Sequence, residues 1–337
     1  MKTRNRYSWL IGILVIAIFG TGIGFALAQS DDFPGEATVG PLPVDVVNGR
    51  DVFETSAGLP YIVDPALIQS GGPKKDGIPS IDVPQFVSVE EADEWIADNE
   101  LVLAIIYKGI QRVYPLQILV WHEIVNDVVA GDPLLISYCP LCGSGIAYDR
   151  TFGNEAVEFG TSGKLYNSNL VMYDRRTDTY WSQIDGLAIV GELTGMELTA
   201  ISIDTVAWRD WKAAHPDSEV LSQDTGYSRD YGRDPYGNYY EDSFIWFPVE
   251  GRDDRIHPKT VVFGVEVNGA YVAYREEDLI SLGAIEDRVG GVRIRISRDE
   301  AGGVWVRDLS TANEIVKERD FWFAWYAFHP DTKLYLP

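Results

Sequence analysis

The chain has 337 residues, a formal net charge of −23, two cysteines and four histidines. Such acidity argues against a surface that binds nucleic acid or anionic lipid, because both would be repelled. Two cysteines also cannot supply the framework of several disulfides found in small exported folds, so any role they have is local chemistry.

The first 28 residues have the features of an export signal. Three basic residues precede an apolar run over residues 9–28, which ends in Ala26-Leu27-Ala28, a pattern that signal peptidases recognise. The run is also long enough to span a bilayer, so an uncleaved N-terminal anchor is the alternative to a signal peptide. Both predict an exported protein, periplasmic or at the cell surface, that meets the membrane only through residues 9–28.

The rest of the chain divides by composition. Residues 29–80 are rich in Pro, Gly and Asp and predict an irregular N-terminal segment, whereas residues 81–337 predict one main β-rich domain. Val87–Asn99 is expected to be a helix that Ser88 caps. Leu101–Tyr107 and Arg112–Tyr114 predict a hairpin that turns at Lys108-Gly109.

Further short elements follow along the chain. Apolar runs predict strands at residues 134–138, 146–148, 157–159, 170–173, 180–183, 261–267, 270–274 and 292–296. Helices are expected at Asp204–His215, with Asp204 as N-cap, and near Phe321–Phe328. The predicted fold class is α+β, mostly antiparallel β-sheet with a few short helices.

A weak similarity at an offset of 160 residues raises the question of an internal duplication. At this offset, Gly109 and Tyr114 match Gly269 and Tyr274. Separately, and at a different offset, a Trp-x-x-Trp-x-x-x-His-Pro motif occurs at Trp208 and again at Trp322. The half-repeats would be residues 100–221 and 260–336, degenerate in sequence. Chance similarity between β-hairpins is the alternative.

The pattern Cys139-Pro140-Leu141-Cys142-Gly143 allows three interpretations. It is typical of a metal-binding turn, in which Gly lets backbone N–H groups point at thiolate sulfur. Two intervening residues are also the spacing of a redox dithiol. The third alternative is a structural role. The turn lies at the junction of the candidate strands 134–138 and 146–148, and we expect it to join them and to face a concave, partly polar surface.

Other side chains could complete a site at the cysteines. His122, in Trp121-His122-Glu123, could supply a third metal ligand or lower a thiol pKa, or it could simply pair with a carboxylate. Thiolate and imidazole ligands favour copper or zinc as the cofactor, and Met172 would favour copper. The candidate pocket residues are Ser144, Lys164, Tyr166, Asn167, Ser168 and Met172.

The motifs together resemble the domain of unknown function 3179 family. The segments that carry this resemblance are Trp121–Asp127, Tyr138–Gly145, Ser162–Ser168, Met172–Arg175, Tyr180–Gln183 and Phe321–Trp325 with His329-Pro330. The resemblance covers residues 80–336. It implies an exported or membrane-attached bacterial or archaeal protein, and it implies no activity.

Three functions therefore remain open. The first is an extracytoplasmic metal-binding protein that uses Cys139, Cys142 and His122 for metal handling, with a metal donor or acceptor as partner, or for a metal-assisted reaction. The second is a thiol-disulfide oxidoreductase that uses the same cysteines. The third is a non-enzymatic binding module whose aromatic loop Ser228–Ser243 recognises a glycan, another small molecule or a protein partner.

Overall fold

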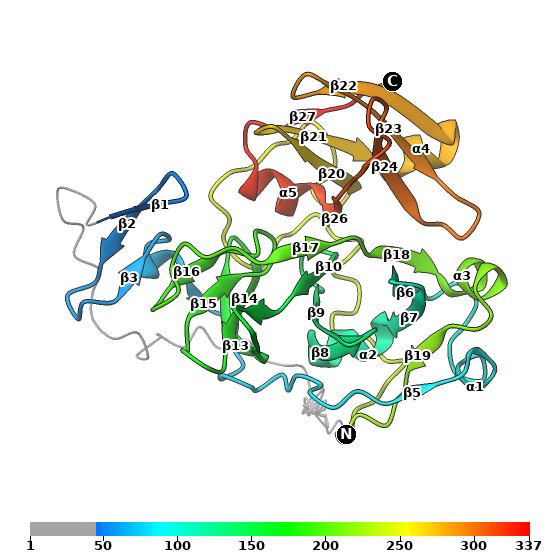
Figure 1. Cartoon of the computed structure of the whole chain (residues 1–337), viewed down its shortest axis with the longest axis horizontal. Coiled ribbons are helices and arrows are strands. Elements are labelled where there is room, and N and C mark those ends of the chain that lie inside the picture. Colours follow the sequence, from blue (N-terminus) through cyan, green and yellow to red (C-terminus); the bar gives the residue numbers. More distant parts are fainter. Residues whose placement is uncertain (1–44) are drawn as a thin grey trace, which may run out of the picture.

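The computed structural model describes residues 45–337 (Figure 1). The predicted export signal lies outside these residues. The described chain is β-rich, with mostly antiparallel sheets and a few short helices, which confirms the α+β prediction at this level. No helix within residues 45–337 is long and apolar enough to cross a membrane.

Two hairpins separated by a helix form the centre of the first unit. The predicted hairpin is present, and its turn is tight because Lys108 and Gly109 both adopt positive φ, 48° and 85°. The elements are β6 (Leu101–Tyr107), β7 (Ile110–Pro115), α2 (Leu116–His122), β8 (Ile124–Val129), β9 (Asp132–Cys139) and β10 (Ser144–Asp149). The sequence pattern therefore predicted both strands of the first hairpin, as well as β9 and β10, but it did not predict β8.

Two sheets complete this unit. One has the order β18-β6-β7-β19-β5 and the other β17-β10-β9-β8. The added elements are β5 (Phe86–Val87), α1 (Val89–Ala92), β17 (Thr199–Ile201), β18 (Asp204–Ala207), α3 (Trp208–Ala214) and β19 (Glu219–Leu221). Ser88 caps α1 as expected, but the helix has a single turn.

The prediction that Asp204 caps a helix is wrong. Asp204 begins β18, and α3 starts only at Trp208 with Ala207 at the capping position. The carboxylate of Asp204 instead pairs with Lys317 at 2.9 Å. A β-branched run after Asp204 pairs with β6, and this sheet pairing overrides the local capping signal.

An eight-stranded sheet lies to one side of this unit (Figure 1). Its order is β1-β2-β3-β16-β15-β14-β13-β4. The N-terminal segment is thus not wholly irregular, because four of its short strands join this sheet. The bounds are β1 (Asp45–Val47), β2 (Arg50–Glu54), β3 (Pro60–Tyr61), η1 (Pro65–Leu67), β4 (Gln69–Ser70), β11 (Thr151–Phe152), β12 (Glu155–Ala156), β13 (Phe159–Tyr166), β14 (Asn169–Asp174), β15 (Tyr180–Ser182) and β16 (Ala188–Val190).

The C-terminal unit packs above the first unit in Figure 1, with β26 against β10. Its sheets have the orders β26-β20-β21-β27 and β22-β23-β24-β25. The bounds are β20 (Val261–Val267), β21 (Ala270–Arg275), α4 (Glu276–Leu282), β22 (Ala284–Val289), β23 (Val292–Arg298), β24 (Val304–Asp308), β25 (Glu314–Ile315), β26 (Lys317–Phe321), α5 (Trp322–Phe328) and β27 (Lys333–Leu334).

The two units share an order of elements but are not equal halves. In each, a hairpin is followed by a helix of seven residues and a second hairpin, and the helices α2 and α4 are 160 residues apart. Only the first unit has a long insertion between its second hairpin and its C-terminal helix, and strands β13–β16 of this insertion join β1–β4 in the eight-stranded sheet. The four sheets of four or five strands form a propeller-like arrangement rather than a plain tandem of two halves.

Candidate functional site

The cysteine turn joins two neighbouring strands, as predicted. Cys139 ends β9 and pairs with Ser144 at the start of β10. The turn closes through a hydrogen bond from the backbone N of Cys142 to the carbonyl O of Cys139 at 3.1 Å. Gly143 has φ 63°, a conformation in which glycine is favoured. The backbone N of Phe321 donates to the carbonyl O of Cys142 at 2.7 Å, so the turn also holds the C-terminal unit.

Both thiols lie in the core rather than on a concave surface. Cys139 and Cys142 are 2% and 0% exposed, and neither is in a disulfide. Burial raises the pKa of the Cys142 thiol well above its usual value. Its sulfur approaches the carbonyl O of Ser168 at 3.4 Å, and Asn169 donates to it at 3.5 Å. A buried thiol with a raised pKa is a poor nucleophile.

His122 has partners other than the cysteines. Its Nδ1 lies 2.7 Å from the carbonyl O of Pro79, and its Nε2 lies 2.6 Å from the hydroxyl of Tyr231. Burial lowers the pKa of His122 to about 4, so the ring is neutral at pH 7. The expected carboxylate partner is also absent, because Asp127 binds Arg112 and Tyr114 instead.

Both ring nitrogens of His122 are thus engaged away from sulfur. Among residues 45–337, no group of three or more His, Cys, Asp and Glu side chains is arranged to hold a metal ion. A copper or zinc site at the cysteines would therefore have two buried thiols as ligands, and the described residues supply no third ligand.

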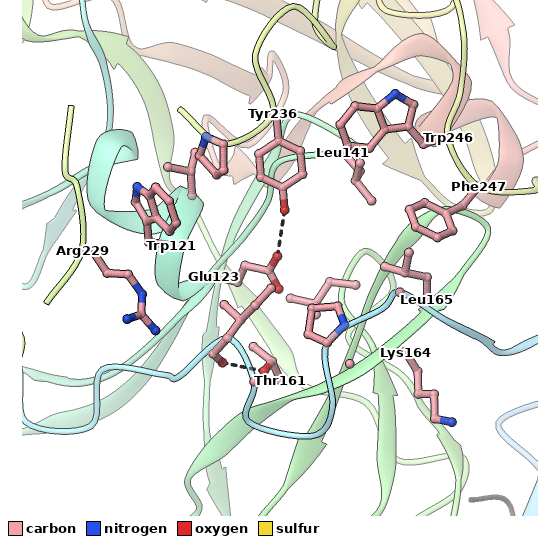
Figure 2. A pocket seen from close by; sticks show the side chains of 18 residues that line it. Trp121, Glu123, Leu141, Thr161, Lys164, Leu165, Arg229, Tyr236, Trp246 and Phe247 are labelled. Carbon is pink, nitrogen blue, oxygen red and sulfur yellow. Dashed lines mark hydrogen bonds between the residues drawn. The ribbon is translucent and has the colours of Figure 1, made fainter. Parts of the chain in front are cut away.

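A cavity lined by described residues lies next to the cysteine turn, at Leu141 (Figure 2). Its volume is about 540 Å³, within the range of small-molecule sites. The walls come from segments far apart in the sequence: the N-terminal strap 71–78, the end of α2, strand β13, and the loop 229–247. The lining is mostly apolar, and its polar side chains are Glu123, Thr161, Lys164 and Arg229. We call it the Glu123 pocket.

Glu123 is the buried carboxyl of this pocket. It directly follows α2, where its backbone N bonds the carbonyl O of Leu119 at 2.7 Å and its φ is 59°. Positive φ is strained for a residue with a side chain. The side chain is nearly fully buried, and burial raises its pKa to about 8. Glu123 is therefore protonated at pH 7 and can both donate and accept a hydrogen bond.

Within the described residues, the side chain of Glu123 has one hydrogen-bond partner, the phenol of Tyr236. The hydroxyl of Tyr236 donates to Oε1 of Glu123 at 3.3 Å, a long bond, as Figure 2 shows. Burial and the adjacent Glu123 raise the pKa of Tyr236 as well. The carboxyl group thus keeps hydrogen-bonding capacity that a molecule in the pocket could use.

Aromatic rings and two cations surround this carboxyl. Trp121, Tyr236, Trp246 and Phe247 form the aromatic walls, and the rings of Tyr236 and Trp246 stack with centroids 5.9 Å apart. Arg229 and Lys164 lie on opposite sides in Figure 2, and the Lys164 ammonium points away from Glu123. Neither cation is among the causes of the Glu123 pKa shift, so the centre of the pocket is uncharged.

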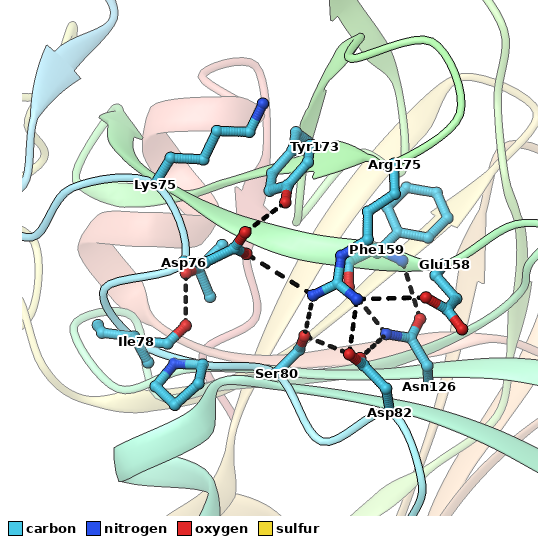
Figure 3. A network of polar contacts seen from close by, with 12 residues as sticks. Lys75, Asp76, Ile78, Ser80, Asp82, Asn126, Glu158, Phe159, Tyr173 and Arg175 are labelled. Carbon is cyan, nitrogen blue, oxygen red and sulfur yellow. Dashed lines mark hydrogen bonds and ion pairs between the residues drawn. The ribbon is translucent and has the colours of Figure 1, made fainter.

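A polar network holds the N-terminal strap against the pocket (Figure 3). The guanidinium of Arg175 binds Asp82 at 2.6 Å and Ser80 at 2.9 Å. Within the strap, Tyr173 donates to Asp76 at 2.6 Å, and Thr161 donates to the carbonyl O of Ile78 at 2.6 Å. Thr161 and Ile78 line the pocket, so this network positions one of its walls.

The predicted pocket residues divide between pocket, turn and core. Lys164 lines the Glu123 pocket, whereas Ser144 and Met172 are fully buried in strands β10 and β14. Asn167 and Ser168 form the turn between β13 and β14, and Tyr166 donates to Glu250 at 2.9 Å. The carbonyl O of Ser168 accepts the contact from the sulfur of Cys142.

Sequence reasoning missed the carboxyl at the centre of the pocket. The sequence gives no indication that Glu123, Trp246 and Phe247 line one pocket. A signal was present in the motif Trp121-His122-Glu123, which places a carboxylate beside an aromatic residue just after an apolar helix. The distant strap and loop that bury Glu123 leave no such local signal.

The fold and the site define a β-rich protein with a mostly apolar pocket around the buried carboxyl of Glu123. The chain belongs to the family described as "Protein of unknown function (DUF3179)", whose model matches residues 75–332. This confirms the resemblance found in the sequence. No curated protein and no solved structure matches the chain.

Proposed function

We propose that this protein is a non-enzymatic binding module whose Glu123 pocket holds a small, uncharged and largely apolar molecule with one hydrogen-bonding group. One observation carries the proposal: Glu123 is buried in an apolar cavity with a pKa of about 8 and a single long hydrogen bond. A buried polar group lacking good partners is costly, and a bound ligand that pairs with it recovers that cost.

The charge pattern favours an uncharged ligand. A cation would ionise Glu123 and would have to be desolvated among the rings of Trp246 and Phe247. An anion would be repelled by the net charge of −23 and would reach Arg229 or Lys164 only at the sides of the pocket. A neutral molecule buries its apolar surface against the aromatic walls and pairs its polar group with Glu123.

A neutral fluorescent probe, N-phenyl-1-naphthylamine, tests this function. We expect saturable fluorescence enhancement with the wild type and at least a tenfold weaker affinity with Leu165→Trp, because the larger ring fills the pocket. The matched control is Leu282→Trp, which adds the same bulk at an exposed position on α4. Equal binding by both variants would place the probe elsewhere and would remove this function.

The metal and dithiol hypotheses remain proposals of lower rank. Against the first stand the engaged ring nitrogens of His122, and against the second stands the burial of Cys142. Elemental analysis of protein purified under reducing conditions distinguishes them from ligand binding. Stoichiometric copper or zinc that is lost in Cys139→Ser would restore the metal hypothesis to first place.

Export and duplication complete the proposal. The basic and apolar start of the chain supports export to the periplasm or cell surface, which N-terminal sequencing of the mature protein would test. A degenerate duplication is supported by β6, β7 and α2, each of which has a counterpart of the same length 160 residues later in β20, β21 and α4.

A further inference from the structure

A second cavity lies on the far side of the aromatic loop from the Glu123 pocket. Its volume is about 460 Å³, and it opens between α2, strand β9 and the C-terminal unit. Val120 contributes to both cavities, and the loop contributes Asp234 and Tyr240 here but Pro235 and Tyr236 to the Glu123 pocket. The two cavities therefore share a wall but present different side chains.

Tyr138 supplies a buried hydroxyl to this second cavity. The side chain is only 5% exposed, and its hydroxyl makes no hydrogen bond to any residue in the range 45–337 that the structure describes. Burial is the main cause that raises the pKa of Tyr138, and the charges of Arg319 and Asp234, which also line the cavity, lower it and raise it respectively. This phenol thus faces both a cation and an anion across the cavity.

The other polar groups of the cavity also retain bonding capacity. Arg319 binds Glu276 through Nε at 3.2 Å, and its terminal nitrogens make no hydrogen bond within residues 45–337. Asp234 accepts a hydrogen bond from the backbone N of Tyr236 at 2.8 Å, and its carboxylate also lies near the hydroxyl of Tyr240. The amide nitrogen of Gln117 donates to Glu100 at 2.6 Å, which leaves the amide oxygen as an acceptor.

Two aromatic rings accompany these groups. Tyr240 and Phe321 line the cavity with ring centroids 6.3 Å apart and planes tilted by 53°. The hydroxyl of Tyr240 is buried and has no hydrogen-bond partner of good geometry. The cavity therefore combines apolar ring faces with several hydrogen-bond donors and acceptors and with charges of both signs.

We propose that this second cavity binds an uncharged saccharide of one or two rings. Hydroxyl groups both donate and accept, so they can pair with Tyr138, Asp234 and Arg319 together, while the C–H face of a sugar packs on Tyr240 or Phe321. An apolar ligand would leave these groups unpaired, and an anion would meet Asp234 and Glu100. The proposal is independent of the Glu123 pocket.

Calorimetric titration with cellobiose, maltose and N,N′-diacetylchitobiose tests the proposal. We expect saturable binding of at least one of them, weakened about fivefold to tenfold by Tyr138→Phe, which removes one hydroxyl. Asp234→Asn, at an exposed position that does not endanger the fold, should also weaken binding. Tyr107→Phe is the matched control, since it removes a hydroxyl bonded to Asp132 elsewhere in the unit.

Two results would overturn the proposal. One is no heat of binding with any of the three sugars up to about 10 mM, beyond the weakest affinity of a specific site. The other is binding that neither Tyr138→Phe nor Asp234→Asn weakens. Glu123→Gln should leave sugar binding unchanged. A failure of the saccharide proposal can therefore be distinguished from a failure of the function proposed for the Glu123 pocket.

Discussion

Two helix ends, one in each unit, adopt the same backbone conformation with different residues. Glu123 follows α2 with φ 59°, and Gly283 follows α4 with φ 73°. Glycine is the ordinary residue at such a position because it has no side chain to strain. In the C-terminal unit the helix ends in this ordinary way. In the first unit a carboxyl takes the strained position and lines a pocket, and this difference supports the proposed binding role of Glu123.

Asp127 sharpens the contrast, because it is buried four residues after Glu123. Its carboxylate accepts bonds from Arg112 at 2.9 Å and from Tyr114 at 2.6 Å, whereas Glu123 has one bond of 3.3 Å. In the C-terminal unit Tyr274 and Asp287 repeat the Tyr–Asp pair at 2.9 Å. The Tyr–Asp pair is thus part of the framework in both units, whereas Glu123 has no counterpart in the C-terminal unit.

The largest expected effect is on the framework. Asp127→Ala should lower the free energy of unfolding by about 3 kcal/mol, because it removes a buried carboxylate that pairs with Arg112 and Tyr114 and leaves Arg112 with only Glu219. Denaturant unfolding measures this. The control Asp287→Ala removes a carboxylate with no arginine partner, and we expect a loss of only about 1 kcal/mol. Equal losses would contradict the distinction between the two sites.

The next largest expected effect is a pH dependence of the free energy of unfolding, which the titration of Glu123 causes. Its folded pKa of about 8 exceeds its unfolded value near 4.5, so the folded state binds the proton more tightly. Stability should then fall by roughly 1.4 kcal/mol per pH unit between about pH 4.5 and 8 from this group.

Other buried carboxyls titrate in the same range, including Asp185 and Asp320 with pKa values of about 6 and 7. The quantity to measure is therefore the difference in unfolding free energy between wild type and Glu123→Gln at each pH. This difference should shift in favour of the variant as the pH rises. A difference that stays constant from pH 5 to pH 9 would mean that Glu123 is ionised in the folded protein.

Glu123→Gly copies the helix end of the C-terminal unit. We expect it to raise the stability at pH 7 by about 1 kcal/mol, because glycine relieves the positive φ, and to weaken binding in the Glu123 pocket. Thermal unfolding and probe titration measure the two effects. If Glu123→Gly lost stability and kept full binding, the strained carboxyl would be structural.

The smallest expected effect concerns Tyr236. Tyr236→Phe removes one long hydrogen bond to Glu123, and it should change the unfolding free energy by no more than about 1 kcal/mol. The pKa of Glu123 should rise further, because this bond lowers it. A ¹³C NMR titration of the Glu123 carboxyl measures the shift. A fall of the pKa in Tyr236→Phe would contradict the assigned bond.

The sequence predicted the local elements better than the site. Alternating apolar residues and the turn Lys108-Gly109 specify the hairpins, and short-range physics determines them. The spacing of the cysteines predicted their turn but not the burial of their sulfurs, which depends on Ser168, Asn169 and Phe321 from distant elements. Asp204 illustrates the reverse case, in which sheet pairing overrode a sound capping signal.

The Glu123 pocket escaped prediction for the same reason. Its carboxyl acquires a raised pKa only when the strap 71–78 and the loop 229–247 fold over the end of α2. Neither segment has a periodic pattern, and each lies tens of residues from Glu123 in the chain. Long-range burial of this kind leaves no mark in the residues around the carboxyl itself.

The pH profile of N-phenyl-1-naphthylamine binding tests the central claim most directly. A neutral ligand can bind over a protonated Glu123. If Glu123 is ionised, binding becomes weaker, because the ligand would bury a charged carboxylate. With the wild type we predict constant affinity below about pH 7 and a loss approaching tenfold per pH unit above about pH 8, while Glu123→Gln binds equally at all pH values. Parallel profiles for the two proteins would contradict the account.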